Sequence, residues 1–90
     1  MEQSCIHCII EGRVQGVWYR AFAKKKAAQL GITGWAKNLS NGSVEILACG
    51  EPKNLDVFRH ALLKGPVLAH VSNLLFEEIA FEKHDDFLTR

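Results

Sequence analysis

The sequence lacks the features that mark several classes of protein. It contains no apolar run long enough to span a membrane. Its first residues are polar, without the basic start and apolar stretch of a secretory signal. Its formal net charge is only +1 at pH 7, so it has no basic excess for nucleic acid or an anionic membrane surface. We therefore expect a cytoplasmic protein that binds neither nucleic acid nor membrane.

Cysteine and histidine are too few and too scattered for a disulfide framework or a metal site. The chain has three cysteines and four histidines, and the histidines show no ligand spacing. Cys5 and Cys8 are spaced as in a CxxC motif, but they lie in an apolar stretch typical of a strand. Residues three apart in a strand face opposite sides, so these two thiols cannot easily share a metal. We expect no metal and no cofactor.

The overall amino-acid composition is typical of one small globular domain. Hydrophobic residues make up 48% of the 90 residues and charged residues 23%. This length supports one hydrophobic core and leaves no room for a second. We expect a single domain over residues 1–90, and a monomer.

Hydrophobic periodicity predicts the element order β-α-β-β-α-β. The expected strands are 6–10, 34–38, 43–49 and 71–79, with residues 87–90 as a candidate short closing strand. The expected helices are 18–30 and a segment that opens at 50–52 and ends before 65. The strand 71–79 alternates poorly, and its run 74–76 is interpreted as doubly buried or bulged. The order predicts an α+β fold, a ferredoxin-like open-faced sandwich in which an antiparallel sheet carries two helices on one face.

This topology brings two distant cysteines together. It places strand 6–10 beside strand 43–49, running antiparallel, so that Cys5 and Cys49 meet at one end on the face away from the core. A cross-strand disulfide is geometrically feasible there, whereas a reducing cytoplasm favours free thiols. Both alternatives stay open, and a count of free thiols decides between them.

The segment Gly12–Arg20 joins the first strand to the first helix and offers three features that bind an oxyanion. Gly12 and Gly16 permit backbone angles that turn successive N–H groups inward. The helix that begins near Trp18 presents unpaired N–H groups and the positive end of its dipole. Arg20, in the first turn, can bind two oxygens of one phosphate. The alternative is a loop with two turn glycines and a surface arginine.

Asn38 is a second candidate, because it ends a strand directly before the hairpin signal Asn41-Gly42. A turn asparagine commonly bonds its own backbone. From spacing alone, that structural role is the favoured one.

At these residues the chain resembles the acylphosphatases over nearly its whole length. The resemblance is carried by Gly12–Val17 followed by an aromatic residue and Arg20, by Gly31–Asn38, by Asn41–Glu45, and by Gly65-Pro66 with Ala69 and Val71. It implies hydrolysis of small acyl phosphates to a carboxylate and inorganic phosphate, without a metal or a covalent enzyme intermediate.

The resemblance also implies a role for each site residue. Arg20 corresponds to the phosphate-binding arginine and Asn38 to the water-orienting asparagine. The backbone amides that would cradle phosphate, or sulfate in its place, are those of Gln15, Gly16, Val17, Trp18 and Tyr19. Two of these depart from the family pattern. Trp18 stands where a smaller residue is common and is expected to alter the mouth of the site or the substrate preference. Tyr19 replaces phenylalanine, a conservative change if its hydroxyl finds a partner.

Two other functions are compatible with this element order. A binding or regulatory module, like the similar domains inside hydrogenase-maturation carbamoyltransferases, would bind phosphate without turnover. An RNA-recognition domain would stack bases on aromatic residues of its central strands. The outward positions of the first and third strands hold no aromatic residue: Cys5, His7, Ile9, Glu45, Leu47 and Cys49. That absence and the near-neutral charge disfavour RNA.

Overall fold

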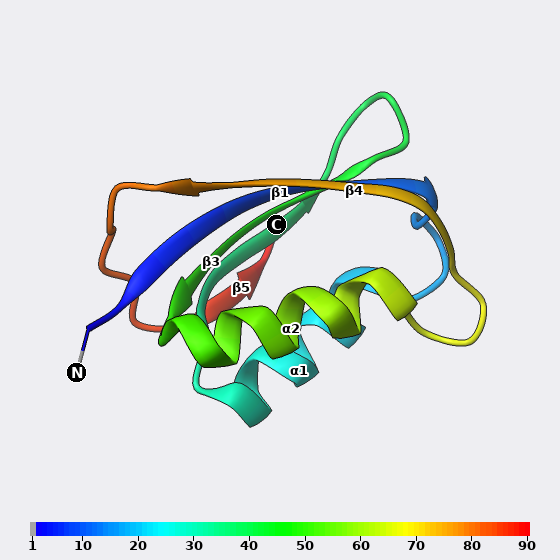
Figure 1. Cartoon of the computed structure of the whole chain (residues 1–90). Coiled ribbons are helices and arrows are strands. Elements are labelled where there is room, and N and C mark those ends of the chain that lie inside the picture. The colour runs from blue at the N-terminus through cyan, green and yellow to red at the C-terminus, as the bar shows by residue number, and fades with distance from the viewer. Residues whose placement is uncertain (1) are drawn as a thin grey trace.

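The computed structural model describes residues 2–90 as one sheet with two helices on the same face (Figure 1). The elements are β1 (Ser4–Arg13), α1 (Tyr19–Leu30), β2 (Thr33–Asn38), β3 (Val44–Gly50), α2 (Pro52–Lys64), β4 (His70–Ile79) and β5 (Phe87–Thr89). The strand order is β4-β1-β3-β2-β5. The predicted α+β, ferredoxin-like fold is confirmed. Within residues 2–90, no helix has the length and apolar character needed to cross a membrane.

The sheet differs from the prediction in two respects. It is mixed, because β5 pairs parallel to β2 while the other three pairings are antiparallel. The interpretation of residues 74–76 as doubly buried or bulged was wrong. β4 is an edge strand with only β1 beside it, so Leu75 is 54% and Phe76 50% exposed. The irregularity in the β1–β4 pairing falls instead between Glu11 and Gly12.

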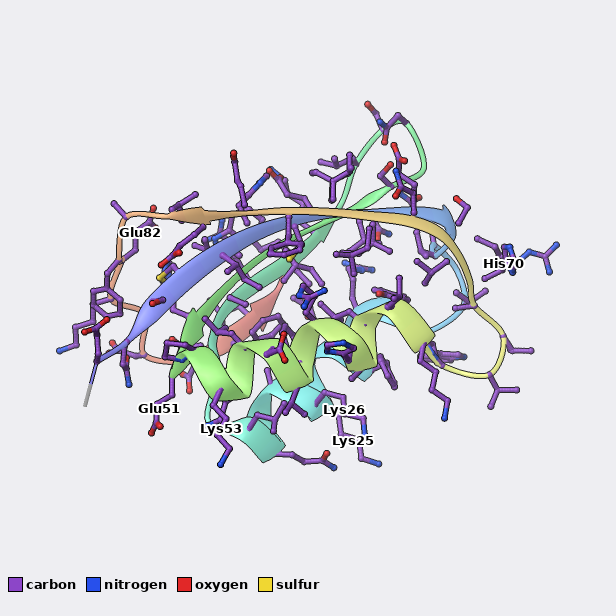
Figure 2. The ribbon with its side chains drawn as sticks, viewed as in Figure 1. Lys25, Lys26, Glu51, Lys53, His70 and Glu82 are labelled. Atoms are coloured by element: carbon purple, nitrogen blue, oxygen red, sulfur yellow. A yellow bond between two sulfur atoms is a disulfide. The ribbon has the colours of Figure 1, made fainter. Side chains whose placement is uncertain are left out.

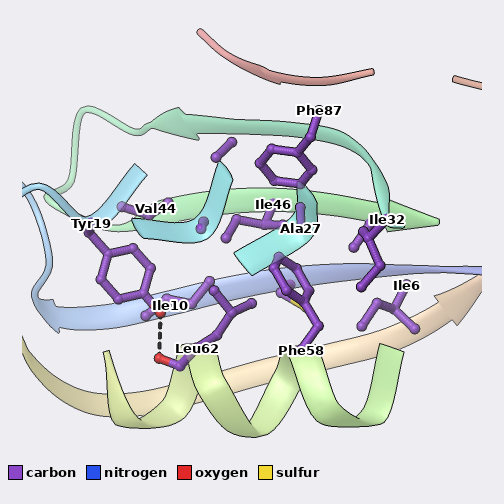
Figure 3. Packing of buried hydrophobic residues seen from close by; sticks show 14 of the residues in the cluster. Ile6, Ile10, Tyr19, Ala27, Ile32, Val44, Ile46, Phe58, Leu62 and Phe87 are labelled. Atoms are coloured by element: carbon purple, nitrogen blue, oxygen red, sulfur yellow. Dashed lines mark hydrogen bonds between the residues drawn. The ribbon is translucent and has the colours of Figure 1, made fainter. Parts of the chain in front are cut away.

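The main core fills the space between the sheet and the helices (Figure 3). The inward side chains of the two central strands are Ile6, Cys8, Ile10, Val44, Ile46 and Ala48. Phe58 of α2 meets Phe87 of β5 edge-on, with the ring centroids 5.9 Å apart. Each large apolar side chain buried in this way contributes about 1.5–3 kcal/mol. The polar side of α1 carries Lys25 and Lys26, which extend away from the sheet (Figure 2).

The opposite face of the sheet carries a second, smaller cluster of Cys5, Leu47 and Cys49. Cys5 lies directly across from Cys49 in the β1–β3 register, with the Cα atoms 4.0 Å apart, and the structure joins the two sulfurs in a disulfide. Cys8 faces the main core as a buried free thiol, and burial raises its pKa to about 12. Cys5 and Cys8 therefore face opposite sides of the strand, as the spacing predicted.

Candidate functional site

The loop between β1 and α1 spans residues 14–18, and its shape depends on a glycine. Gly16 has φ 72°, a left-handed conformation that glycine adopts without strain, although there is open space around its Cα. Val14 is buried in the main core and Val17 packs partly against it, so both ends of the loop are anchored. Gly12, just before the loop, lies so close to β4 that a Cβ there would overlap the carbonyl of His70.

The backbone N–H groups of residues 15–19 have no acceptor within the described chain, residues 2–90. The first helical hydrogen bond of α1 runs from the N–H of Phe22 to the carbonyl of Trp18, at 3.0 Å. Amides that precede this bond at a helix start are free to donate to a ligand. A helix N-terminus also favours negative charge, so this loop is suited to an anion.

The side chain of Gln15 ties the loop to the β2–β3 hairpin. Its Nε2 donates to the carbonyl of Leu39 at 2.7 Å and to that of Ser43 at 2.8 Å. These two carbonyls flank the turn that directly follows Asn38. One amide group therefore sets the spacing between the loop and the strand end that carries Asn38.

A cavity of about 400 Å³ lies where the loop, the first turn of α1 and the ends of β2 and β5 meet. Its lining consists of Val14, Gly16, Trp18, Tyr19, Arg20, Ala21, Asn38 and Thr89. Arg20 and Asn38, which are 18 positions apart in the sequence, thus line the same cavity. Gln15 and Val17 are not part of this lining, because the Gln15 side chain is engaged with the hairpin and Val17 leans on the core.

Three lining residues had not been predicted from the sequence: Val14, Ala21 and Thr89. Val14 and Ala21 follow from the loop and helix once their geometry is known. Thr89 reaches the cavity because β5 pairs parallel to β2, with Thr89 opposite Ala36. A three-residue strand has too little periodicity to reveal such a partner in the sequence.

Arg20 and Asn38 both present polar groups that the fold leaves available. Arg20 is half-buried and has no Asp or Glu partner within residues 2–90, and its Nη1 donates to the main-chain oxygen of Arg90 at 2.5 Å. The Asn38 side chain is exposed and makes no hydrogen bond to any described residue. A guanidinium that no Asp or Glu side chain neutralises is the group expected to bind a doubly charged phosphate.

Tyr19 anchors the start of α1 to the end of α2. Its ring is buried, and its hydroxyl donates to the carbonyl of Leu62 at 2.5 Å (Figure 3). Burial, and to a smaller extent the nearby Cys8, raises the pKa of the phenol above its ordinary value, so it stays a protonated donor. The Tyr19 hydroxyl therefore has a hydrogen-bond partner, which was the condition for tyrosine to be a conservative replacement of phenylalanine at this position. It also satisfies one of the carbonyls that a helix C-terminus leaves free.

A separate polar cluster lies on the open face of the sheet, opposite to the helices. His7 Nε2 donates to Glu45 at 2.7 Å, and Lys37 Nζ lies 3.5 Å from the other oxygen of Glu45. The hydrogen bond from His7, with smaller contributions from the charges of His7 and Lys37, lowers the pKa of Glu45 below its ordinary value. Since Asn38 faces the helix side, this cluster is not part of the cavity.

The chain is similar to known proteins of one family. The family model of acylphosphatase matches residues 6–89. An acylphosphatase of Coxiella burnetii (strain Dugway 5J108-111) is 47% identical over 88 residues, which cover 98% of this chain and 93% of that protein.

Solved structures show the same similarity. The structure of an acylphosphatase from Coxiella burnetii has a TM-score of 0.95 and 46% identity, and covers 98% of this chain and 93% of its own. That of an acylphosphatase from Bacillus subtilis has a TM-score of 0.94 and 34% identity, with 97% and 98% covered. Both the sequence match and the structural match extend over nearly the whole chain, so this chain belongs to the acylphosphatase family of hydrolases.

Proposed function

We propose that the cavity hydrolyses small acyl phosphates, with the phosphoryl group held by Arg20 and by the backbone amides of residues 15–19. The observation that carries this proposal is the half-buried guanidinium of Arg20, which has no Asp or Glu partner among residues 2–90, beside a loop whose amides have no acceptor there. The exposed amide of Asn38 lines the same cavity. These groups supply the donors that the equatorial phosphate oxygens need and a polar group for a water molecule.

The reaction requires positioning more than chemical activation. Asn38 holds a water that attacks phosphorus in line with the acyl oxygen. The new P–O bond forms as the bond from phosphorus to the acyl oxygen breaks, and the electron pair leaves with the carboxylate. The water proton passes to a phosphate oxygen, which gives inorganic phosphate. A carboxylate leaves readily without a general acid, so the main contributions are orientation and stabilisation of charge on phosphorus.

The residue types fit these roles. The uncharged amide of Asn38 does not repel the incoming phosphate, whereas a carboxylate at this position would. The positive charge of Arg20 replaces the charge that a metal ion would supply, so the proposed reaction uses neither a metal nor a covalent enzyme intermediate. Every group that takes part comes from one chain, so the mechanism requires no second subunit.

The experiment is the hydrolysis of benzoyl phosphate in the presence of EDTA by the native protein and two variants. Arg20→Gln should lower kcat/KM by about 100-fold or more, because it removes the charge that stabilises the transition state. Asn38→Ala should lower kcat by about 100-fold, with less effect on inhibition by inorganic phosphate. Matched controls are Arg59→Gln, on α2, and Asn73→Ala, on the exposed edge strand β4.

Circular dichroism and a denaturant titration establish that each variant is folded. We expect both controls to keep native rates. Native rates in the folded Arg20 and Asn38 variants would reject the assignment of the site. Loss of activity with EDTA would show that the reaction needs a metal ion.

A further inference from the structure

Trp18 lies at the start of α1 in a backbone conformation that bulky residues rarely adopt. Its φ and ψ are 65° and 22°, and it is the one non-glycine residue with positive φ in the part of the chain that the structure describes. Its neighbours fix this conformation, because Val17 packs against the core and Tyr19 is buried there. Strained residues of this kind concentrate at ligand-binding sites.

The indole of Trp18 has no aromatic or cationic partner among residues 2–90, and the side chain is 77% exposed. The second tryptophan, Trp35, is different. Its ring lies 5.6 Å from Lys37 Nζ and 4.8 Å from the guanidinium carbon of Arg90. Trp35 thus contacts two cationic side chains of the fold, whereas the Trp18 indole has no such contact among the described residues.

Trp18 is also the one large apolar surface that a ligand in the cavity could cover. Of the other apolar lining residues, Val14 and Tyr19 are buried and Ala21 is small. The polar groups of the cavity, Arg20 and the loop amides, are engaged by phosphate in the proposed reaction. The acyl half of the substrate leaves on the side of phosphorus away from the water, so it is free to contact an apolar surface of the cavity.

We propose that Trp18 binds the acyl group and determines specificity, so that the enzyme prefers acyl phosphates with a flat aromatic acyl group over those with a short alkyl group. This inference rests on the proposed function, because it assigns the acyl half of the same site. An aromatic ring can stack on the exposed indole, whereas an acetyl group covers little of it.

The test compares kcat/KM for benzoyl phosphate with kcat/KM for acetyl phosphate. The ratio of the two should fall about 3- to 10-fold in Trp18→Gly, the factor that one aromatic stacking contact supplies. Trp18→Phe keeps a ring and should stay within about twofold of the native ratio. Trp35→Phe, a matched aromatic change outside the cavity, should keep the native ratio.

An unchanged ratio in Trp18→Gly, or an equal fall in Trp18→Phe, would overturn the proposal while the proposed function stands. If the native protein hydrolyses neither compound, the proposed function fails. A binding measurement then still decides the role of Trp18.

That measurement uses the Trp35→Phe variant, in which Trp18 is the single tryptophan because the sequence has two. Phenylphosphonate and methylphosphonate are stable anions that differ in the ring. We expect phenylphosphonate to shift the Trp18 fluorescence to shorter wavelength, since the ring shields the indole from water, and methylphosphonate to have much less effect. Equal responses to the two anions would contradict the inference.

Discussion

At the scale of the residue, Gly16 and Trp18 show how the loop obtains its shape. Both have positive φ, 72° and 65°, but only glycine tolerates such angles without strain. For Trp18 the cost is about 1–2 kcal/mol. The fold bears this cost at a residue that lines the cavity and contributes little to the core.

This strain can be measured with two small substitutions. Trp18→Ala removes the indole but leaves a side chain that is strained at positive φ. Trp18→Gly removes the indole and also the strain, because glycine tolerates positive φ. We expect the glycine variant to be more stable to unfolding than the alanine variant by about 1 kcal/mol, as measured by urea titration. At an ordinary helical position the order would be reversed by a similar amount, so a more stable alanine variant would show that the left-handed conformation is absent.

At the scale of the element, Gln15 couples the β1–α1 loop to the β2–β3 hairpin. Both of its hydrogen bonds use the side-chain NH₂ as donor to backbone carbonyls. Replacing the amide by a carboxylate would remove both donated hydrogen bonds. It would also place a carboxylate oxygen against the carbonyl oxygens of Leu39 and Ser43, so that three acceptors face one another. Such a change costs about 1–3 kcal/mol when the groups are partly buried.

The variant Gln15→Glu tests this coupling through its pH dependence. At neutral pH the carboxylate repels the two carbonyls, so Asn38 loses its position relative to the loop and kcat falls. At acid pH the protonated carboxyl regains one donor, so kcat should recover relative to the native protein. The control Gln29→Glu is exposed on α1 and should follow the native pH profile. A Gln15→Glu profile parallel to the native one would show that the loop is positioned without this side chain.

The elements themselves could be predicted from the sequence to different degrees. Alternating Ile6, Cys8 and Ile10 defined β1, and the three- and four-residue spacing from Tyr19 to Leu30 defined α1, because these patterns reflect one buried face. The exposure of Leu75 and Phe76 could not be foreseen, since a strand at the edge of a sheet can have the same composition as one inside it.

The sequence pointed to some of the residues that line the cavity, Arg20 and Asn38 among them. The residue types around Arg20 suggested an anion-binding loop, whereas spacing alone favoured a structural role for Asn38, and the role proposed for Asn38 came from the resemblance to the acylphosphatases. The Gln15 bonds join residues 24 and 28 positions apart, and no local pattern encodes such contacts. The positive φ of Trp18 was equally invisible, because the helical periodicity around it only suggested that the helix begins there.

At the scale of the whole molecule, the disulfide between Cys5 and Cys49 would fasten β1 to β3, two central strands separated by 44 positions in the chain. Closing a loop of this length restricts the unfolded chain and is worth about 2–4 kcal/mol. Its presence in solution is a prediction that thiol counting tests.

The count is made on unreduced protein with a coloured thiol reagent. We expect no reactive thiol in the native state, because Cys8 is buried and burial holds its pKa at about 12. Unfolding in denaturant should expose one thiol, and unfolding with a reductant three. The variant Cys8→Ala should give none, none and two. Three thiols in the unfolded, unreduced protein would show that Cys5 and Cys49 are not bonded.

The central claim is that the cavity holds the phosphoryl group and directs water to phosphorus. The most direct measurement is the hydrolysis of benzoyl phosphate in water enriched in oxygen-18, with both products analysed by mass spectrometry. Attack on phosphorus predicts that the label enters inorganic phosphate and that benzoate carries none. Label in the benzoate would mean that water attacks the carbonyl carbon, and it would contradict the roles proposed for Arg20, the loop amides and Asn38.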